Sequence, residues 1–145
     1  MIPEADLQKL LATMKPELQP GEYVFASVID DDRKIAQDAV VGWFRESEGI
    51  TLILERSAAI AAGIEFSFPS RMITLTVHSS LEAVGFLAVI TERLAAADIS
   101  VNAISAYFHD HLFVPFQKAD ITMHILHNIM EEAAFSLQNQ SSTGN

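Results

Sequence analysis

The second half of the chain changes its hydrophobic period from that of a strand to that of a helix. Apolar and polar residues alternate over residues 73–77, which is typical of a half-buried strand. Helical spacing follows over residues 80–97, and Ser79 with Glu82 has the spacing of a capping box. These patterns predict a strand that passes directly into a helix starting near Ser80. The apolar face of this helix is expected to carry Val84, Leu87, Ala88, Leu94 and Ala95.

Two β-prone runs and a second helical pattern complete this half. Residues 101–108 and 112–116 flank a polar turn, so they predict a hairpin. Residues 118–134 return to helical spacing. The order strand, helix, hairpin, helix is most of a ferredoxin-like βαββαβ unit. Its fourth strand cannot be found here, and we expect the first half of the chain to lend it.

The first half repeats this order in a shorter form. Strand patterns occur at residues 22–29 and 64–68, a hairpin pattern at residues 39–45 and 50–54, and a helical pattern at residues 57–62. The hairpin segments of the two halves match in order and character, which indicates a faint internal repeat. Residues 30–38 stand where the first helix of this half belongs and are too short for a full one. An amphipathic helix at residues 6–14 is expected to cover the face left bare.

The predicted fold class is therefore α+β, with two ferredoxin-like halves, the first abbreviated. Each half is expected to form an antiparallel sheet with helices on one face. The expected organisation is an N-terminal cover helix at 1–19, a first half at 20–69, a second half at 70–135 and a disordered tail at 136–145.

The junction between strand and helix also resembles a known family. The pair Ser79-Ser80, Gly85 in the first turns and the later run Ile99-Ser100-Val101-Asn102 resemble the ACT domain, a small regulatory module that binds ligands. The runs ITLTVHSSLEAVGFLA and AYFHDHLFVP together resemble more closely a group of short, mostly bacterial proteins with tandem ACT domains. This resemblance covers roughly residues 20–130. It implies two ACT-type halves and an amino acid or similar effector bound at the strand-to-helix loop.

This junction is the strongest candidate binding site. A helix start presents N–H groups without intrahelical partners and the positive end of the helix dipole, which favour a ligand carboxylate. The resemblance implies contacts at the small residues there, and Glu82 or Asp110 is a candidate partner for the amine end. The serine is equally explained as a cap, and Gly85 by close packing of the helix. The candidate ligand-binding residues are His78, Ser79, Ser80, Leu81, Glu82, Gly85 and Asp110.

Other chemistry at these positions is less favoured. His109 and His111 lie two residues apart and could begin a metal site with His78, but no open position or second shell can be recognised. The carboxylates at residues 30–32 lack calcium-loop spacing and predict a solvated turn. Neighbouring positions such as His78 and Ser79 cannot easily align a hydrolytic triad with Glu82. We therefore expect no catalysis, no metal and no cofactor.

Composition narrows the classes of partner. Nineteen acidic and nine basic side chains give a formal charge of −10, which disfavours nucleic acid and anionic membrane surfaces. Half of the residues are hydrophobic and none is cysteine, so a sizeable core without disulfides is expected. The first residues lack the pattern of a signal peptide. The expectation is a soluble cytoplasmic protein.

The favoured function is a non-catalytic regulatory or sensing module that binds an amino acid or a similar small carboxylate. One alternative is an interaction protein with a vestigial site, and a metal-assisted enzyme using His78, His109 and His111 is a further one. Phe86, Val89 and Ile90 lie off the main apolar stripe of their helix, so the other half or a second chain is expected to cover them. Exposed sheet edges would also favour side-by-side pairing, so a homodimer is predicted.

Overall fold

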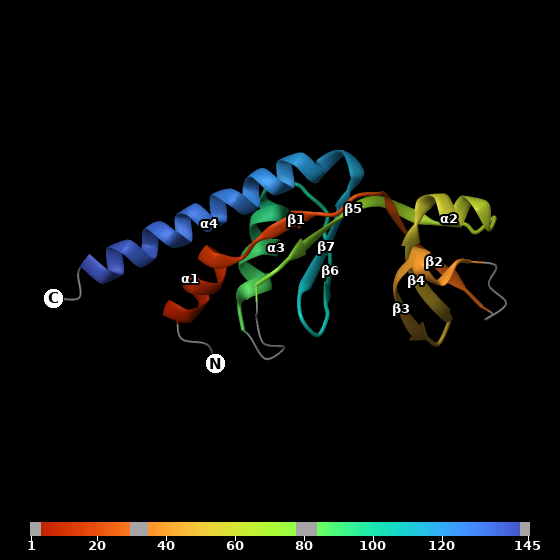
Figure 1. The fold of residues 1–145 in the computed structure, drawn as a ribbon, viewed down its shortest axis with the longest axis horizontal. Coiled ribbons are helices and arrows are strands. Elements are labelled where there is room, and N and C mark those ends of the chain that lie inside the picture. Colours follow the sequence, from red (N-terminus) through yellow and green to blue (C-terminus); the bar gives the residue numbers. More distant parts are fainter. Residues whose placement is uncertain (1–3, 30–34, 78–83, 143–145) are drawn as a thin grey trace.

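The computed structural model describes residues 4–29, 35–77 and 84–142, which form a curved antiparallel sheet with helices packed on it (Figure 1). The strands described follow the order β3-β4-β2-β5-β7-β6, and β1 pairs with β5 beside this path. The strands are β1 (Pro16–Leu18), β2 (Tyr23–Val28), β3 (Val40–Glu46), β4 (Gly49–Glu55), β5 (Ser67–Leu75), β6 (Asn102–Ser105) and β7 (Asp110–Pro115). The helices are α1 (Glu4–Thr13), α2 (Arg56–Ala61), α3 (Phe86–Ala96) and α4 (Ala119–Ser142), with short 3-10 helices at Gln37–Ala39 and Phe116–Lys118. The predicted α+β class with two ferredoxin-like halves is confirmed.

Strand β5 belongs to both halves of the sheet. Its first residues pair with Tyr23 and Phe25 of β2, and its later residues pair with β7 on one side and β1 on the other. The halves are therefore joined by continuous backbone hydrogen bonding as well as by the chain. Figure 1 shows β5 crossing from one half to the other.

A bulge allows β5 to continue through a proline. The register between β2 and β5 shifts, and Phe68 adopts a φ of 60° at this point, immediately before Pro69. Proline has no N–H to donate to a ladder, and a bulge is one of the few places in a sheet that tolerates it. The separate strands predicted at residues 64–68 and 73–77 are thus wrong, because a single strand runs from Ser67 to Leu75.

The fourth strand of the second half comes from the N-terminal segment. Pro16 pairs with Leu75 and Leu18 with Ile73, so this half has the order β1-β5-β7-β6. This segment lies just before the bounds of 20–69 predicted for the first half, so the strand is lent by the N-terminal part of the chain. The segment was hidden in the sequence because three residues are too few to show a period.

The first half has the equivalent order β5-β2-β4-β3. Of the segment at residues 30–38, the described part holds only the start of the 3-10 helix at Gln37–Ala39. Ile35 packs there against a small core that includes Val24, Leu52 and Ala59 of α2. The turn predicted at residues 30–32 lies outside the described residues.

Helix α1 packs on the second half instead of the first, which corrects the predicted cover helix. Leu11 and Met14, the latter fully buried, lie in one core with Leu94 of α3 and Leu126 of α4. Since β1 follows α1 directly and pairs with β5, the backbone itself ties this helix to the second half. Figure 1 shows α1 beside α4 and α3.

Helix α3 starts later than predicted. Val84 and Gly85 are not helical, and Gly85 has a left-handed φ of 92°, so the helix begins at Phe86 instead of near Ser80. Its buried face consists of Phe86, Ile90 and Leu94, spaced by four residues. The predicted stripe was therefore wrong for Val84, Ala88 and Ala95, which are exposed. Phe86 and Ile90, which were expected to need a second covering surface, are buried in the core.

Helix α4 extends beyond its predicted end. It continues to Ser142, so the disordered tail expected from residue 136 is wrong as far as residue 142. Ala133 is buried in the core of the second half, and α1 packs against this helix, which supports turns beyond its predicted end. A polar helix end without tertiary contacts is only marginally stable, so the sequence alone predicts disorder there.

The sheet faces turned away from the helices also meet. Tyr23 and Ile53 of the first half are buried with Phe113 of the second half. The Phe113 ring makes edge-to-face contacts with Phe25, at 5.4 Å between centroids, and with Tyr23, at 6.2 Å. This aromatic cluster fixes the halves against each other.

Candidate functional site

The predicted binding site lies where β5 ends and α3 begins (Figure 1). His78, Ser79, Ser80, Leu81 and Glu82 lie outside the described residues, so their contacts remain predictions. On either side of them, Val77 is buried and Gly85 precedes the helix. The strand does not pass directly into the helix, which corrects the predicted geometry of the junction.

Gly85 sets the direction in which α3 starts. Its carbonyl oxygen accepts a hydrogen bond from the Val89 N–H at 3.1 Å, which is the first hydrogen bond of the helix. The amides of the first turn come before Val89 and therefore have no intrahelical partner. A Cβ added at Gly85 would lie 3.5 Å from Leu7 of α1, an ordinary contact. The left-handed backbone conformation therefore explains the glycine at this position better than close packing does. The role of Gly85 in ligand binding remains a prediction.

Substitution of Gly85 by alanine is expected to lower the free energy of unfolding by about 1–2 kcal/mol, because a Cβ disfavours the left-handed region. Chemical denaturation of the purified variant measures this. The matched control is Gly42→Ala, since Gly42 has no positive φ and its added Cβ would lie 3.6 Å from Ile53. Equal losses in the two variants would contradict the backbone explanation.

Asp110 begins β7 at the same end of the sheet. It pairs with Leu75, close to the end of β5, and with Ser105 of β6, and it is only 8% exposed. Leu112 and Val114 belong to the core under α3 and α4, and strand alternation places Asp110 on this same face. The register thus brings a carboxylate to the end of the sheet where α3 starts, and its role in binding remains a prediction.

His111 lies on the opposite face and takes part in a polar chain. Its Nδ1 is 3.0 Å from the Thr74 hydroxyl, which accepts a hydrogen bond from the Gln19 side chain at 3.2 Å. Burial is the main cause that lowers the pKa of His111 below its ordinary value of 6.5. The nearby His109 lowers the pKa further, and the Asp110 carboxylate opposes both effects.

The lowered pKa of His111 predicts a loss of stability in mild acid. The folded state favours the neutral imidazole, so this contribution is present above pH 6.5 and is lost as pH falls through the folded pKa. Denaturation curves between pH 8 and pH 5 should show a smaller acid loss in His111→Gln than in the unchanged protein. His127→Gln, on the exposed side of α4, is the control. An unchanged pH dependence in His111→Gln would refute this prediction.

Metal ligands do not converge in the described part of the chain. Across residues 4–29, 35–77 and 84–142, no group of three or more His, Asp or Glu side chains could hold an ion. Alternation also separates Asp110 from His111, which lie on opposite faces of β7.

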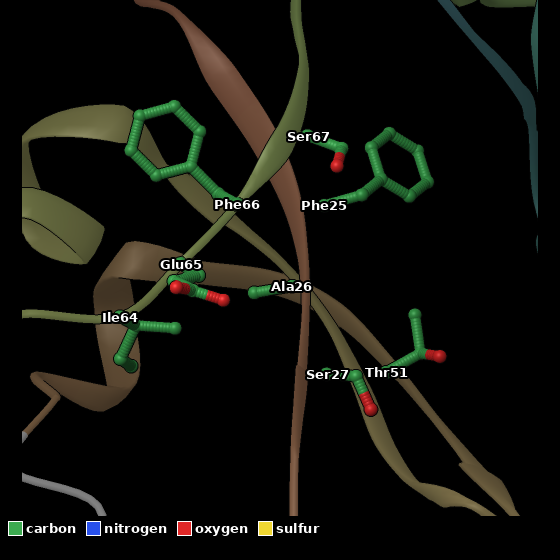
Figure 2. A pocket seen from close by; sticks show the side chains of 8 residues that line it. All are labelled: Phe25, Ala26, Ser27, Thr51, Ile64, Glu65, Phe66 and Ser67. Atoms are coloured by element: carbon green, nitrogen blue, oxygen red, sulfur yellow. The ribbon is translucent and has the colours of Figure 1, made fainter.

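A second position, which the sequence did not indicate, lies in the first half. Beside β2 there is an open hollow of about 820 Å³, and Figure 2 shows the side chains around it. Its lining residues are Phe25, Ala26, Ser27, Thr51, Ile64, Glu65, Phe66 and Ser67. The pattern at residues 64–68 predicts a paired strand, whereas β5 begins only at Ser67 and leaves this edge of β2 open.

Two family models for the ACT domain match the chain, one over residues 3–71 and the other over residues 67–128. The chain belongs to the ACT-domain family. The matches overlap at residues 67–71, which lie within β5, the strand that both ACT domains share. The predicted tandem arrangement is confirmed.

Solved structures share this arrangement. A protein of unknown function from Vibrio cholerae, described as a possible transport protein, is 42% identical, with a TM-score of 0.75 over 86% of this chain and 96% of that chain. A protein from Agobacterium tumefaciens is 17% identical, with a TM-score of 0.66 over 81% and 89% of the two chains. The regulatory subunit of aspartate kinase from Thermus thermophilus is 10% identical, with a TM-score of 0.57 over 81% of this chain and 96% of that chain. At this identity the similarity is evidence for a shared fold alone.

No curated protein matches the sequence closely enough to add a relative of known activity. Among the helices that the structure describes, none combines the length and the apolar character needed to cross a membrane. Membership of the ACT family, whose domains are regulatory modules for small molecules, supports a regulatory role.

Proposed function

We propose that this protein is a non-catalytic regulatory module that binds an amino acid or a related small carboxylate at the junction of β5 and α3. The proposed contacts are His78, Ser79, Ser80, Leu81, Glu82, Gly85 and Asp110. The observation that carries the proposal is the register of β7, which brings Asp110 beside Leu75 on the face that α3 covers. A zwitterion has an anionic and a cationic end, and a helix start and a carboxylate complement these ends.

Calorimetric titration with the twenty amino acids and with related acids tests this function. We expect at least one compound to bind, and Asp110→Asn to weaken its binding by about tenfold through loss of a charged hydrogen bond. Asp120→Asn, exposed at the start of α4, is the control. Absence of binding across the whole panel would argue against the proposal.

We also propose that two copies associate through β3, an edge strand of the sheet. Trp43 and Phe44 are 60% and 71% exposed there, and an open strand edge favours pairing with another strand. Of the two surfaces considered from the sequence, this keeps the sheet edge and leaves out α3, because Phe86 and Ile90 are buried. Sedimentation should show a dimer in the unchanged protein and a monomer in Trp43→Glu, with Ile60→Glu on α2 as the control. A dimer that persists in Trp43→Glu would exclude this edge.

A cytoplasmic location belongs to the same proposal, because free amino acids and the enzymes that they regulate are abundant there. Fractionation of cells that express the tagged protein tests it. Recovery in a membrane or an exported fraction would contradict this location.

A further inference from the structure

The hollow in the first half lies where two neighbouring segments separate. Strand β5 pairs with Tyr23 and Phe25 of β2 and begins at Ser67, so residues 64–66 diverge from β2 without forming a strand. Figure 2 shows Ile64, Glu65 and Phe66 on one side of this space and Ser27 on the other. The hollow therefore lies beside the part of β2 that follows Phe25, which is the last residue of β2 that pairs with β5.

The backbone of Ser27 faces this hollow. The Ser70 hydroxyl donates a hydrogen bond to the Tyr23 carbonyl oxygen at 2.9 Å, so the backbone groups of Tyr23 point toward β5. Alternate residues of a strand direct their backbone groups to the same edge, which places those of Ser27 on that edge too. No backbone partner of Ser27 on this edge is found among the described residues. The N–H group of Ser27 can thus donate a hydrogen bond to a molecule in the hollow, and its carbonyl oxygen can accept one.

The charges around the hollow are negative. Glu65 lines it, and Figure 2 shows its carboxylate directed toward β2. Thr51, which also lines it, donates a hydrogen bond to the Glu46 carboxylate. No lysine or arginine is among its described lining residues. The Arg56 guanidinium stacks over the Phe66 ring, with 5.8 Å to the ring centroid, and pairs with Glu22 at 3.3 Å.

The lining contains both polar and apolar groups. The hydroxyls of Ser27, Thr51 and Ser67 accompany the carboxylate, and Phe25, Ile64 and Phe66 supply apolar surface. Carboxylate and hydroxyl oxygens, together with a backbone carbonyl, are acceptors for an ammonium group. A carboxylate or a phosphate would be repelled by the Glu65 carboxylate, which no lysine or arginine among the described lining residues balances.

We propose that this hollow is a second ligand site, specific for a small primary amine that carries an apolar group. The ammonium group donates to the Glu65 carboxylate and to the Ser27 carbonyl oxygen. The apolar group lies against Ile64 and Phe66, which pack on the same side of β2 as Ala26. This site is separate from the β5–α3 junction, which lies in the other half, and it does not depend on the function proposed there.

Three probes of one shape and different charge test this specificity. Benzylamine, benzyl alcohol and benzoate are titrated into the full-length protein labelled with ¹⁵N, and amide shifts are followed. Benzylamine is expected to shift the amides of Ser27, Glu65 and Ser67, whereas benzoate leaves them unchanged. Shifts of similar size with benzoate, or benzylamine shifts confined to other regions, would overturn the proposal.

Substitution of the carboxylate provides the second arm. Glu65→Gln is expected to weaken benzylamine binding by about fivefold, as for a partly exposed ion pair. Glu92→Gln is the matched control, because Glu92 lines a different hollow of about 660 Å³ beside α3. Equal affinities in the two variants would overturn the proposal. Both glutamates are exposed, so neither change should alter the fold.

The two sites can be tested independently. An amino acid bound at the junction should shift the amides of Gly85 and Asp110, whereas benzylamine should not. Failure of the amino acid panel therefore leaves the benzylamine result standing, and the reverse also holds.

Discussion

Replacement of Phe113 by alanine is expected to lower the free energy of unfolding by about 3–5 kcal/mol, the range for large-to-small changes of buried aromatic residues. Phe113 is 2% exposed and its ring makes edge-to-face contacts with Tyr23 and Phe25. The loss combines the transfer free energy of the ring with the cavity left between the halves. Because these contacts join the two ACT domains, the change should also loosen the packing that holds the domains in one relative orientation.

Denaturation by urea, followed by circular dichroism and by Trp43 fluorescence, measures this effect. The two probes should give one transition in the unchanged protein and separated transitions in Phe113→Ala if the halves lose their coupling. Phe108→Ala is the control, because Phe108 is 63% exposed. A loss below about 1 kcal/mol in Phe113→Ala would mean that the aromatic cluster does not hold the halves together.

Replacement of Met14 by alanine is expected to destabilise the protein by about 2–5 kcal/mol. Met14 lies between α1 and β1, is fully buried, and packs in the core of the second half. The loss should therefore affect the second ACT domain, although Met14 lies in the N-terminal segment, because β1 is paired with β5.

Hydrogen exchange distinguishes this expectation from a local effect. In Met14→Ala, amides of β5 and β7 should exchange faster than in the unchanged protein, whereas those of β3 and β4 should change little. Ile60→Ala on α2, where Ile60 is 59% exposed, is the control. Faster exchange limited to α1 would show that the N-terminal segment is only an accessory to the second domain.

Local patterns in the sequence were sufficient for most elements. The alternation at residues 22–29 and 50–54 predicted strands that β2 and β4 confirm, and the helical spacing from residue 118 matches most of α4. Such patterns succeed because one face of each element is buried in a core. They failed at α3, where Gly85 in a left-handed conformation delays the helix, since a capping-box spacing says nothing about the φ of a later residue.

The candidate sites were harder to predict than the elements. The sequence indicated Asp110 together with the α3 start, and the register of β7 brings these to one end of the sheet. It did not indicate the hollow beside β2, because the serine, threonine and glutamate that line it are scattered over three segments. Their convergence depends on where β5 stops pairing with β2, which no local pattern records.

By itself, the sequence determined the class of fold, its division into two similar halves and the absence of disulfides. Only the tertiary structure decided that β5 serves both halves, that β1 completes the second sheet and that α1 packs on that side. The physical reason is that hydrophobic period is a property of neighbouring residues, whereas strand pairing depends on which distant edges are left open. A three-residue strand such as β1 has almost no period of its own, so its place is set by the unpaired edge of β5 that it satisfies.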